Sequence, residues 1–539
     1  MIEFIKYFKI IFTLCFVSIS NLLFSANYYV AVAASGDGSG VDASNESATI
    51  QNIFDTYDLA SGDIINVAAG TYTETSIVVG SNDEGFIIQG AALSGGIPTS
   101  IFDSNESGRW MLLNNTNNDD ITINNIYIKD HKQNSGSGPN NGGGGLKIIT
   151  GATGFSINYC YFENCNSRTN FSQNYGGGIY ASEGISVSNC TFFNCNAEYN
   201  GGAIAMSLSP TTSSDITYCT FYSNYASNYG GAIYYGISST HTLTFTNNLV
   251  YSNQNSGGGE AAIVVINTGS TMDITNCTIT KNGNASIGTG GVLALSSAKC
   301  NILNSIIYDN LGSTYDDVYD NTATVTMQNS FYKVQGSVSL TAPNSTADPL
   351  FTDPSTNDYT LQVTSTAVDY GTTTGAPTDD ILSYTRTAVP DAGAFEFGGA
   401  APLPISLVDF KASLIGRDVL LTWSTFSERN NDYFSVEKTF DGKNFSIVGY
   451  QNGSMNSNSL ISYSLYDFNV ENSLLYYRLK QTDFDGQTTY SKLISIDNRE
   501  MTDKKIVGIF NLLGQEIDEN YEGLIIVVYS DGTTIKQVK

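Results

Sequence analysis

A repeat of 28 to 30 residues in the middle of the chain constrains the fold most. One column of this repeat contains, in order, Cys160, Cys190, Cys219, Asn248, Cys277 and Ser305. The position two residues later is apolar in every copy, as at Phe192 and Phe221, and Cys or Asn recurs three positions after it. No copy contains a ten-residue stretch with a helical period, so the repeat predicts short strands separated by turns.

The length of the repeat predicts how these strands pair. A strand of four to six residues cannot bury one of its faces alone. If the chain winds once per repeat, equivalent strands of successive coils pair in parallel, about 4.8 Å apart. We therefore predict a right-handed parallel β-helix in which Phe192 and Phe221 are direct neighbours. We also expect the Asn amides of one column to hydrogen-bond along the stack, and Gly-Gly to form the sharp corners.

Two motifs of the repeat resemble a known family. Phe-x-x-Asn at Phe221 and Gly-Gly-Ala-Ile at 201–204 and 230–233 resemble the repeat of polymorphic outer-membrane adhesins and related pectin-lyase-like β-helix proteins. The resemblance implies that residues 27–398 form the solenoid. Its start, over 27–105, resembles a cap in which a short amphipathic helix near Ile50 plugs the open end, and residues 348–398 are expected to close the other end.

The first 26 residues are predicted to be a secretory signal peptide. A short basic start precedes an apolar run from Ile10 to Phe24 and the small residues Ser25 and Ala26. The run is about 15 residues long, which is short for a membrane span, although an anchor helix is the alternative. No later segment reaches 18 apolar residues, so we expect no transmembrane helix in the mature chain.

Residues 403–497 are predicted to form a second domain. Alternating strands recur there between turns such as Asp441-Gly442, which favours an immunoglobulin- or fibronectin-like β-sandwich. Trp423 is expected in its core, with a ligand platform as the alternative. The whole chain is thus expected to be all-β.

The last segment, 499–539, resembles the type A C-terminal sorting domain of the type IX secretion system of Bacteroidetes. The matching residues are Asn511-Leu-Leu-Gly514-Gln515, Gly523-Leu-Ile-Ile-Val, Asp531-Gly532, Lys536 and Lys539. The resemblance implies that the type IX machinery is a partner and that the protein is secreted, then either attached to the cell surface or released. The alternative is a small β-domain without a sorting function.

Charge and cysteine content narrow the function classes. With 24 basic and 51 acidic residues, the net charge of −27 argues against nucleic acid as a partner, and the 2 histidines argue against sites built from several imidazoles. His131 is expected to be a turn residue of the Asn column. In-register stacking points the Cβ atoms of the column cysteines the same way, which favours buried thiols over disulfides. The cysteines after the signal peptide are Cys160, Cys165, Cys190, Cys195, Cys219, Cys277 and Cys300.

Catalytic candidates are few. A β-helix polysaccharide lyase needs a Lys or Arg base and a cation for the uronate carboxylate, and Lys129, Lys147 and Arg168 lie in adjacent early coils. A hydrolase would need paired inward carboxylates, and no such series is present in the repeats. Weak calcium candidates are Asp316, Asp317 and Asp320, and no other cofactor is predicted.

Four tyrosines support a binding function. Tyr180 and Tyr234 follow inward Ile residues, so strand alternation points them outward, and Tyr175 and Tyr229 precede the Gly pairs. Exposed tyrosines suit sugar stacking, although Tyr is also an ordinary strand former. We therefore predict a secreted, surface-displayed protein that binds a polysaccharide or a host or neighbouring cell surface, adhesin-like or glycan-binding. The alternatives are a lyase or glycoside hydrolase acting on acidic polysaccharide, and a structural surface-layer element.

Overall fold

The computed structural model of the protein describes three ranges of the chain, 25–399, 407–499 and 506–538. The chain divides into two units, Met1–Pro402 and Leu403–Lys539, and each is described here by itself. Short gaps in the described ranges fall at 92, 95, 114–118, 134–141, 150–152, 168–173, 209, 211, 238–239, 257–260, 284–287, 314–315, 337, 416, 426–427, 458–460, 469, 472, 484–485, 487, 512–513, 518–523 and 531–533.

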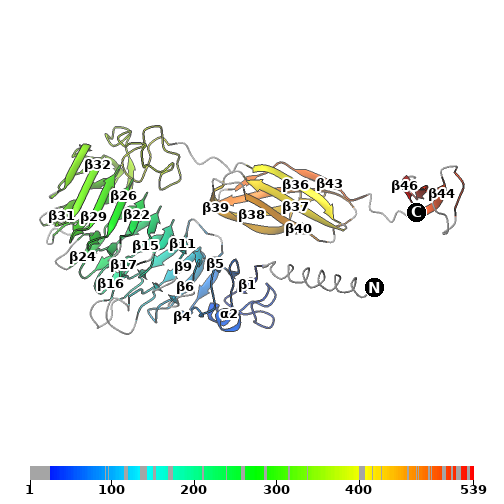
Figure 1. The fold of residues 1–539 in the computed structure, drawn as a ribbon, viewed down its shortest axis with the longest axis horizontal. Helices are drawn as coiled ribbons and strands as arrows, with labels where there is room; N and C mark the ends of the chain where they lie inside the picture. The colour runs from blue at the N-terminus through cyan, green and yellow to red at the C-terminus, as the bar shows by residue number, and fades with distance from the viewer. Residues whose placement is uncertain are drawn as a thin grey trace, which may run out of the picture. The chain divides into compact units, whose positions relative to one another are not determined.

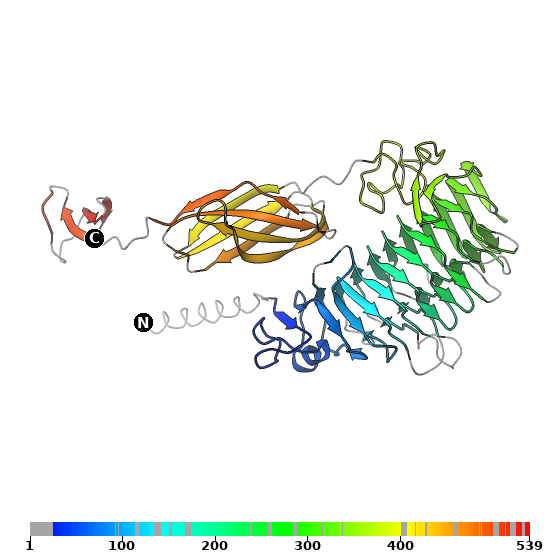
Figure 2. The ribbon, with the colours of Figure 1, turned by 180° about the vertical axis from the view of Figure 1, so that it is seen from behind.

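The first unit is a parallel β-solenoid, as predicted (Figures 1 and 2). Its described strands form a 21-stranded sheet and a 9-stranded sheet, together with a 3-stranded sheet at one corner. Strand β15 (Thr191–Phe193) pairs in parallel with β12 (Tyr161–Glu163) and β19 (Thr220–Tyr222). Phe192 and Phe221 are register partners whose ring centroids lie 5.0 Å apart at an interplanar angle of 6°. The predicted column-by-column stacking is therefore confirmed.

Left-handed residues bend each coil at a fixed place. Asn189, between β14 (Ile185–Ser188) and β15, has a φ of +53°, and Asn247, at the same corner two coils further along, also has +53°. Asn tolerates this conformation better than most residues. At the Gly-Gly corner Gly201 has a φ of +68°, and a Cβ there would lie 2.4 Å from the carbonyl oxygen of Ile204. The corner glycines are thus required, as the repeat suggested.

Buried amides form a ladder along the solenoid. The Nδ2 atoms of Asn224, Asn253 and Asn282 each donate to the Oδ1 of the next asparagine in the column at 2.9 Å. Asn310 continues the series by donating to Oδ1 of Asp317, also at 2.9 Å. Each amide also bonds to backbone, so the ladder satisfies turn groups that would otherwise be buried without partners.

Six of the described cysteines and His131 occupy the ladder columns as expected, whereas Cys300 lies on β29 (Lys299–Leu303) as the register partner of Met272. All seven described cysteines are free and buried. The backbone N–H of Cys190 donates to Sγ of Cys219 at 3.4 Å. Burial raises the pKa of the Cys277 thiol to about 12, so this thiol stays protonated and unreactive. His131 is fully buried, with Nδ1 3.2 Å from the Gly108 oxygen and Nε2 3.1 Å from the Phe102 oxygen. Its burial lowers the imidazole pKa to about 4.

A short helix caps the start of the solenoid. Helix α2 (Ile50–Thr56) begins after Thr49, whose side chain accepts a hydrogen bond from the backbone N–H of Asn52. Its apolar face is buried, and the rings of Phe54 and Phe86 lie 5.2 Å apart. The helix therefore covers core that the first coil would expose, which confirms the predicted N-terminal cap.

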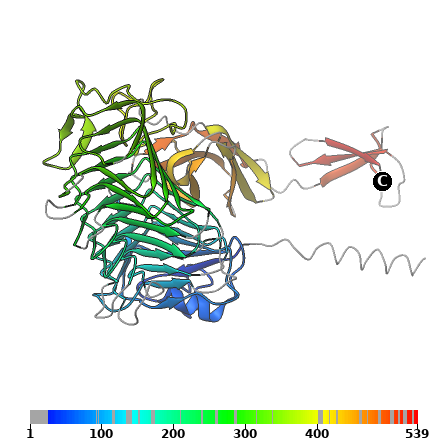
Figure 3. The same cartoon turned by 60° about the vertical axis from the view of Figure 1, so that its left-hand side comes forward.

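Residues 346–399, here called the strap, do not close the other end as expected. Strand β33 (Ser339–Ser345) pairs with β32 (Thr324–Tyr332) at that end, and the strap lies along the flank of the preceding coils (the olive trace in Figures 1 and 3). Left-handed asparagines hold it there: Asn247 donates to the Asp379 oxygen at 2.6 Å and Asn276 to the Asp391 oxygen at 3.0 Å. The expectation was wrong because these outward corner amides, rather than the end of the core, bind the strap.

The second unit contains a β-sandwich. Its core includes Val436 and Trp423, which is 1% exposed, so the predicted core role of Trp423 is confirmed. One sheet contains β36 (Leu407–Ile415), β37 (Asp418–Thr425) and β40 (Ile461–Asp467). The other contains β38 (Glu428–Thr439), β39 (Ser446–Ser457), β41 (Leu474–Asp483), β42 (Thr488–Tyr490) and β43 (Ile494–Asp497).

A small antiparallel sheet follows the sandwich. It consists of β44 (Ile506–Asn511), β45 (Leu524–Tyr529) and β46 (Thr534–Val538). The signal peptide up to Phe24, and Gly523, Asp531, Gly532 and Lys539 of the predicted sorting motif, lie outside the described residues. In the part of the chain that the structure describes, no helix is both long and apolar enough to span a membrane.

Candidate functional site

The four predicted binding tyrosines do not form an open platform. Tyr180 on β13 (Ile179–Ala181) is 0% exposed and Tyr234 on β21 (Ile233–Ile237) is 8% exposed. Both belong to an apolar cluster separate from the main core, so they point outward but are covered. The half-buried Tyr175 packs edge-on against Tyr234 at 5.6 Å and Tyr180 at 6.4 Å, and Tyr229 stacks on Tyr234 at 6.4 Å. The prediction that Tyr180 and Tyr234 are exposed is therefore wrong, because tyrosines of the neighbouring turns cover them.

The lyase candidates are not brought together. Lys129 ends β9 (Ile126–Lys129) in the 21-stranded sheet, whereas Lys147 lies on β10 (Leu146–Ile148) in the 9-stranded sheet. Lys129 Nζ lies 2.8 Å from Asp103 and 3.4 Å from Asp130. The hydrogen bond to Asp103 raises the pKa of Lys129, so this side chain stays protonated and is a poor base. Arg168 lies outside the described residues.

Lys147 differs from the other candidates. It is 7% exposed, and its ammonium has no hydrogen-bond or ion-pair partner among the residues that the structure describes. Burial, together with the charge of Arg109, lowers its pKa to about 8. Arg109 donates to the Gly143 oxygen at 2.7 Å and to the Gly142 oxygen at 2.9 Å. Lys147 is thus a cation that can lose its proton near neutral pH.

The acidic turn proposed for calcium is differently organised. Asp317 is fully buried and accepts hydrogen bonds from Asn310 and from the backbone N–H groups of Lys333 and Val334. Asp316 accepts from a backbone N–H of its own turn, and so does Asp320. In the described part of the chain, no group of three or more His, Cys, Asp or Glu side chains could hold a metal ion. The structure therefore does not assemble these three carboxylates into a ligand set.

The sequence reasoning missed a surface on the opposite sheet. Phe193, Tyr222 and Tyr251, here called the aromatic strip, are register partners on β15, β19 and β23 (Leu249–Tyr251). Their rings are stacked at centroid distances of 4.5 and 5.2 Å, with interplanar angles of 17° and 2°. All three are partly exposed. Each directly follows an inward residue of the repeat, so the same 29-residue spacing could have identified the strip.

Polar groups flank the aromatic strip on both sides. On one side are left-handed corner residues, among them the exposed Asn194 and Ser223, and Asn194 donates to Asn164 at 2.6 Å. On the other side the Tyr161 hydroxyl lies 2.8 Å from the Tyr222 hydroxyl. These amides and hydroxyls can both donate and accept hydrogen bonds. The surface thus combines the edges of stacked aromatic rings with a rim of polar groups, and Glu163 is the register neighbour of Phe193 at its other end.

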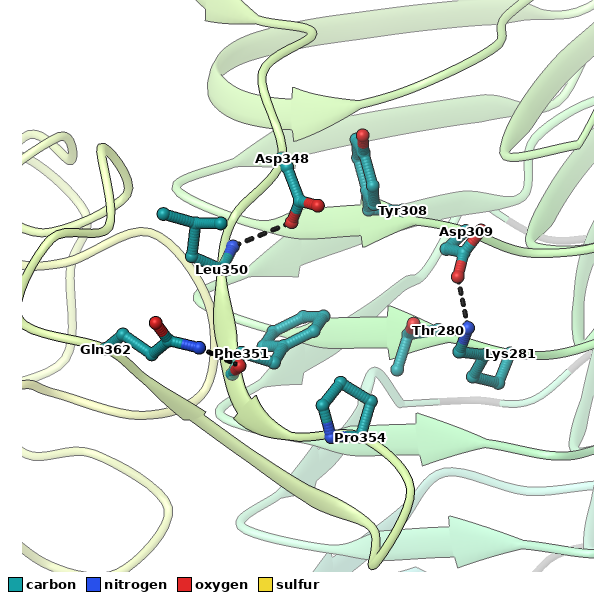
Figure 4. A pocket seen from close by; sticks show the side chains of 9 residues that line it. All are labelled: Thr280, Lys281, Tyr308, Asp309, Asp348, Leu350, Phe351, Pro354 and Gln362. Atoms are coloured by element: carbon teal, nitrogen blue, oxygen red, sulfur yellow. Dashed lines mark hydrogen bonds and ion pairs between the residues drawn. The ribbon is translucent and has the colours of Figure 1, made fainter.

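The strap meets the aromatic strip at one end. The ring of Tyr359 lies 5.2 Å from that of Tyr251 and 5.4 Å from that of Phe351. Beyond this contact is a pocket of about 230 Å³ (Figure 4). The pocket is lined by Thr280, Lys281, Tyr308, Asp309, Asp348, Leu350, Phe351, Pro354 and Gln362.

Comparisons with known proteins give little further guidance. No protein-family model matches the chain, and no curated protein matches it. Among solved structures, the enzymatically active domain of tailspike protein 4 of bacteriophage CBA120 matches at a TM-score of 0.22 and 11% sequence identity. The match covers 83% of this chain and 65% of that domain, so the chain spans less than two thirds of it. At this TM-score the match carries no argument about function.

Proposed function

We propose that the solenoid binds a linear glycan along the aromatic strip. The observation that carries this proposal is the stack of three partly exposed rings, Phe193, Tyr222 and Tyr251, beside a polar rim. The faces of these rings are stacked on one another, so their outward edges form an apolar surface at low entropic cost, and polar groups beside them can bond sugar hydroxyls. The rings repeat along the solenoid axis, which suits a ligand with its own linear repeat.

The proposed setting is the cell surface. The N-terminal segment has the pattern of a signal peptide, and the end of the chain resembles a type IX sorting domain. A glycan-binding solenoid exported by this route would act as an adhesin or as a capture protein for polysaccharide. Expression of the chain in a Bacteroidetes host with and without residues 499–539 tests whether this segment directs the protein to the cell surface. Loss of surface display on truncation is expected, and unchanged display would contradict it.

Binding can be tested by screening immobilised polysaccharides and oligosaccharides with the purified protein. Tyr222→Ala removes the central ring of the strip and is expected to lower affinity about ten-fold. Tyr450→Ala is the matched control, because Tyr450 is 60% exposed and lies in the sandwich. Equal binding by wild type and Tyr222→Ala would exclude the strip as the site.

Lys147 supports a second candidate function, a polysaccharide lyase. A buried amine with a pKa of about 8 and no partner in the described residues is suited to abstract a proton. The test is the ultraviolet absorbance of unsaturated uronides released from pectin, alginate or chondroitin, with Lys147→Met as the variant. Because Lys147 and the strip lie on different sheets, this variant should leave strip-dependent binding unchanged.

A further inference from the structure

The pocket beside the strap has a buried hydroxyl group, that of Thr280, in its wall. Thr280 lines the pocket and is 0% exposed. Its hydroxyl oxygen has no hydrogen-bond partner among the residues that the structure describes. A buried hydroxyl left unsatisfied costs free energy, and such groups in native proteins are usually satisfied by water or a ligand. The Thr280 hydroxyl is thus an unused hydrogen-bonding group in the wall of the pocket.

The register places this pocket in line with the aromatic strip. Thr280 on β27 (Thr278–Thr280) is the register partner of Tyr251, and Tyr308 on β30 (Ile306–Tyr308) is the partner of Thr280. The same outward column therefore runs from the strip into the pocket. The other walls bring hydrogen-bonding side chains, including the Lys281–Asp309 ion pair and Gln362, whose Nε2 donates to the Phe351 oxygen at 2.8 Å.

The strap contacts only one end of the aromatic strip, the end at Tyr251. The strap contains the buried Arg386–Glu396 ion pair, and the ring of its Tyr359 packs against Tyr251 of the strip. A volume of about 230 Å³ is below the roughly 300–1,000 Å³ of pockets that hold drug-sized ligands, so it suits one sugar ring. A glycan that follows the strip therefore meets the strap at Tyr359, and Phe351, whose ring lies 5.4 Å from that of Tyr359, also lines the pocket.

We infer that the protein recognises the end of a glycan chain, with the terminal sugar residue in the pocket and the following residues on the aromatic strip. This inference rests on the proposed glycan binding. Thr280 and the pocket side chains would bond hydroxyls of the terminal residue, and the strap would exclude internal segments. Chain ends would then determine affinity, whatever the length of the polymer.

The test uses linear hexasaccharides of β-1,4-glucose, β-1,4-xylose, β-1,4-mannose, β-1,3-glucose and α-1,4-galacturonic acid, with the full-length protein. Each is measured with both ends free, with the reducing end coupled to an aromatic amine, and with the non-reducing residue methylated. For any hexasaccharide that binds, we expect modification of one end to weaken binding at least about ten-fold and modification of the other to change little.

Thr280→Val removes the hydroxyl with little change of shape and is expected to weaken binding about five-fold. Thr488→Val is the control, since Thr488 is exposed and lies on β42 of the sandwich, away from the strip and the pocket. Binding that is insensitive to both end modifications and to Thr280→Val would overturn chain-end recognition and leave glycan binding by the strip standing. Failure of all five hexasaccharides to bind, with no binding in the wider screen, would overturn both.

Discussion

Arg386 and Glu396 form a buried ion pair, with Nη1 3.0 Å from Oε2 and side chains 2% and 0% exposed. Arg386 also donates to Asn247 at 2.8 Å, which joins the strap to the solenoid. Glu396 accepts hydrogen bonds from the backbone N–H groups of Thr387 and Asp391. This ion pair therefore joins two parts of the strap to each other, and through Arg386 it also joins the strap to the solenoid at Asn247.

Arg386→Met should loosen the strap. The change leaves Glu396 buried without its cation, which typically costs about 3–5 kcal/mol. Hydrogen exchange is expected to rise over residues 346–399, and thermal unfolding should begin at a lower temperature. Arg499→Met is the control, because Arg499 is exposed and lies in the second unit. Unchanged exchange in the strap would show that the pair does not anchor it.

Asn253→Ala should destabilise the solenoid. The Asn253 amide bonds Asn282, the Phe221 oxygen and the N–H of Asn224, so the change leaves several buried groups without partners. We expect a loss of about 2–4 kcal/mol in the free energy of unfolding, measured by urea denaturation. Asn301→Ala, at an exposed position, should cost less than about 0.5 kcal/mol. Similar losses for both variants would contradict a special role for the ladder.

His131 should make the solenoid acid-sensitive. Burial lowers its pKa from 6.5 to about 4, so the unfolded chain binds the proton more readily than the folded one. Its contribution to stability is therefore complete above about pH 6.5 and is lost as the pH falls through 4. His131→Asn, which restores the residue type of the ladder column, is expected to flatten the pH dependence of the unfolding free energy between these values.

Asp391 acts in the opposite direction over the same range. Burial raises its pKa to about 6, so its contribution decreases as the pH rises from about 4 to 6. The test of His131 is therefore the difference between wild type and variant at each pH, in which the Asp391 term cancels. A difference that does not change with pH would contradict the assignment.

Lys147 should titrate near pH 8. Because its folded-state pKa lies below the usual 10.5, its ammonium destabilises the folded protein below pH 8, and this penalty is relieved as the pH rises toward 10.5. The Cε resonance of Lys147 is expected to show a titration midpoint near pH 8. A midpoint near the usual 10.5 would show that Lys147 is solvated and would weaken its candidacy as a base.

The repeat predicted the solenoid, the buried thiols and the amide ladder because these depend only on which residues share a column. Phe192 and Phe221 stack because one coil takes a fixed number of residues, and that number is visible in the sequence. The capping helix was equally predictable, since its apolar spacing is local.

The tertiary structure decided which outward residues are exposed. Strand alternation points both Tyr180 and Tyr222 away from the core, but Tyr180 is covered and Tyr222 is not. The strap lies beside Tyr251 because corner amides far away in the sequence bind it. Periodicity fixes the direction of a side chain, whereas what covers it depends on contacts between segments that no local pattern relates, and these contacts create the strip and its contact with the strap.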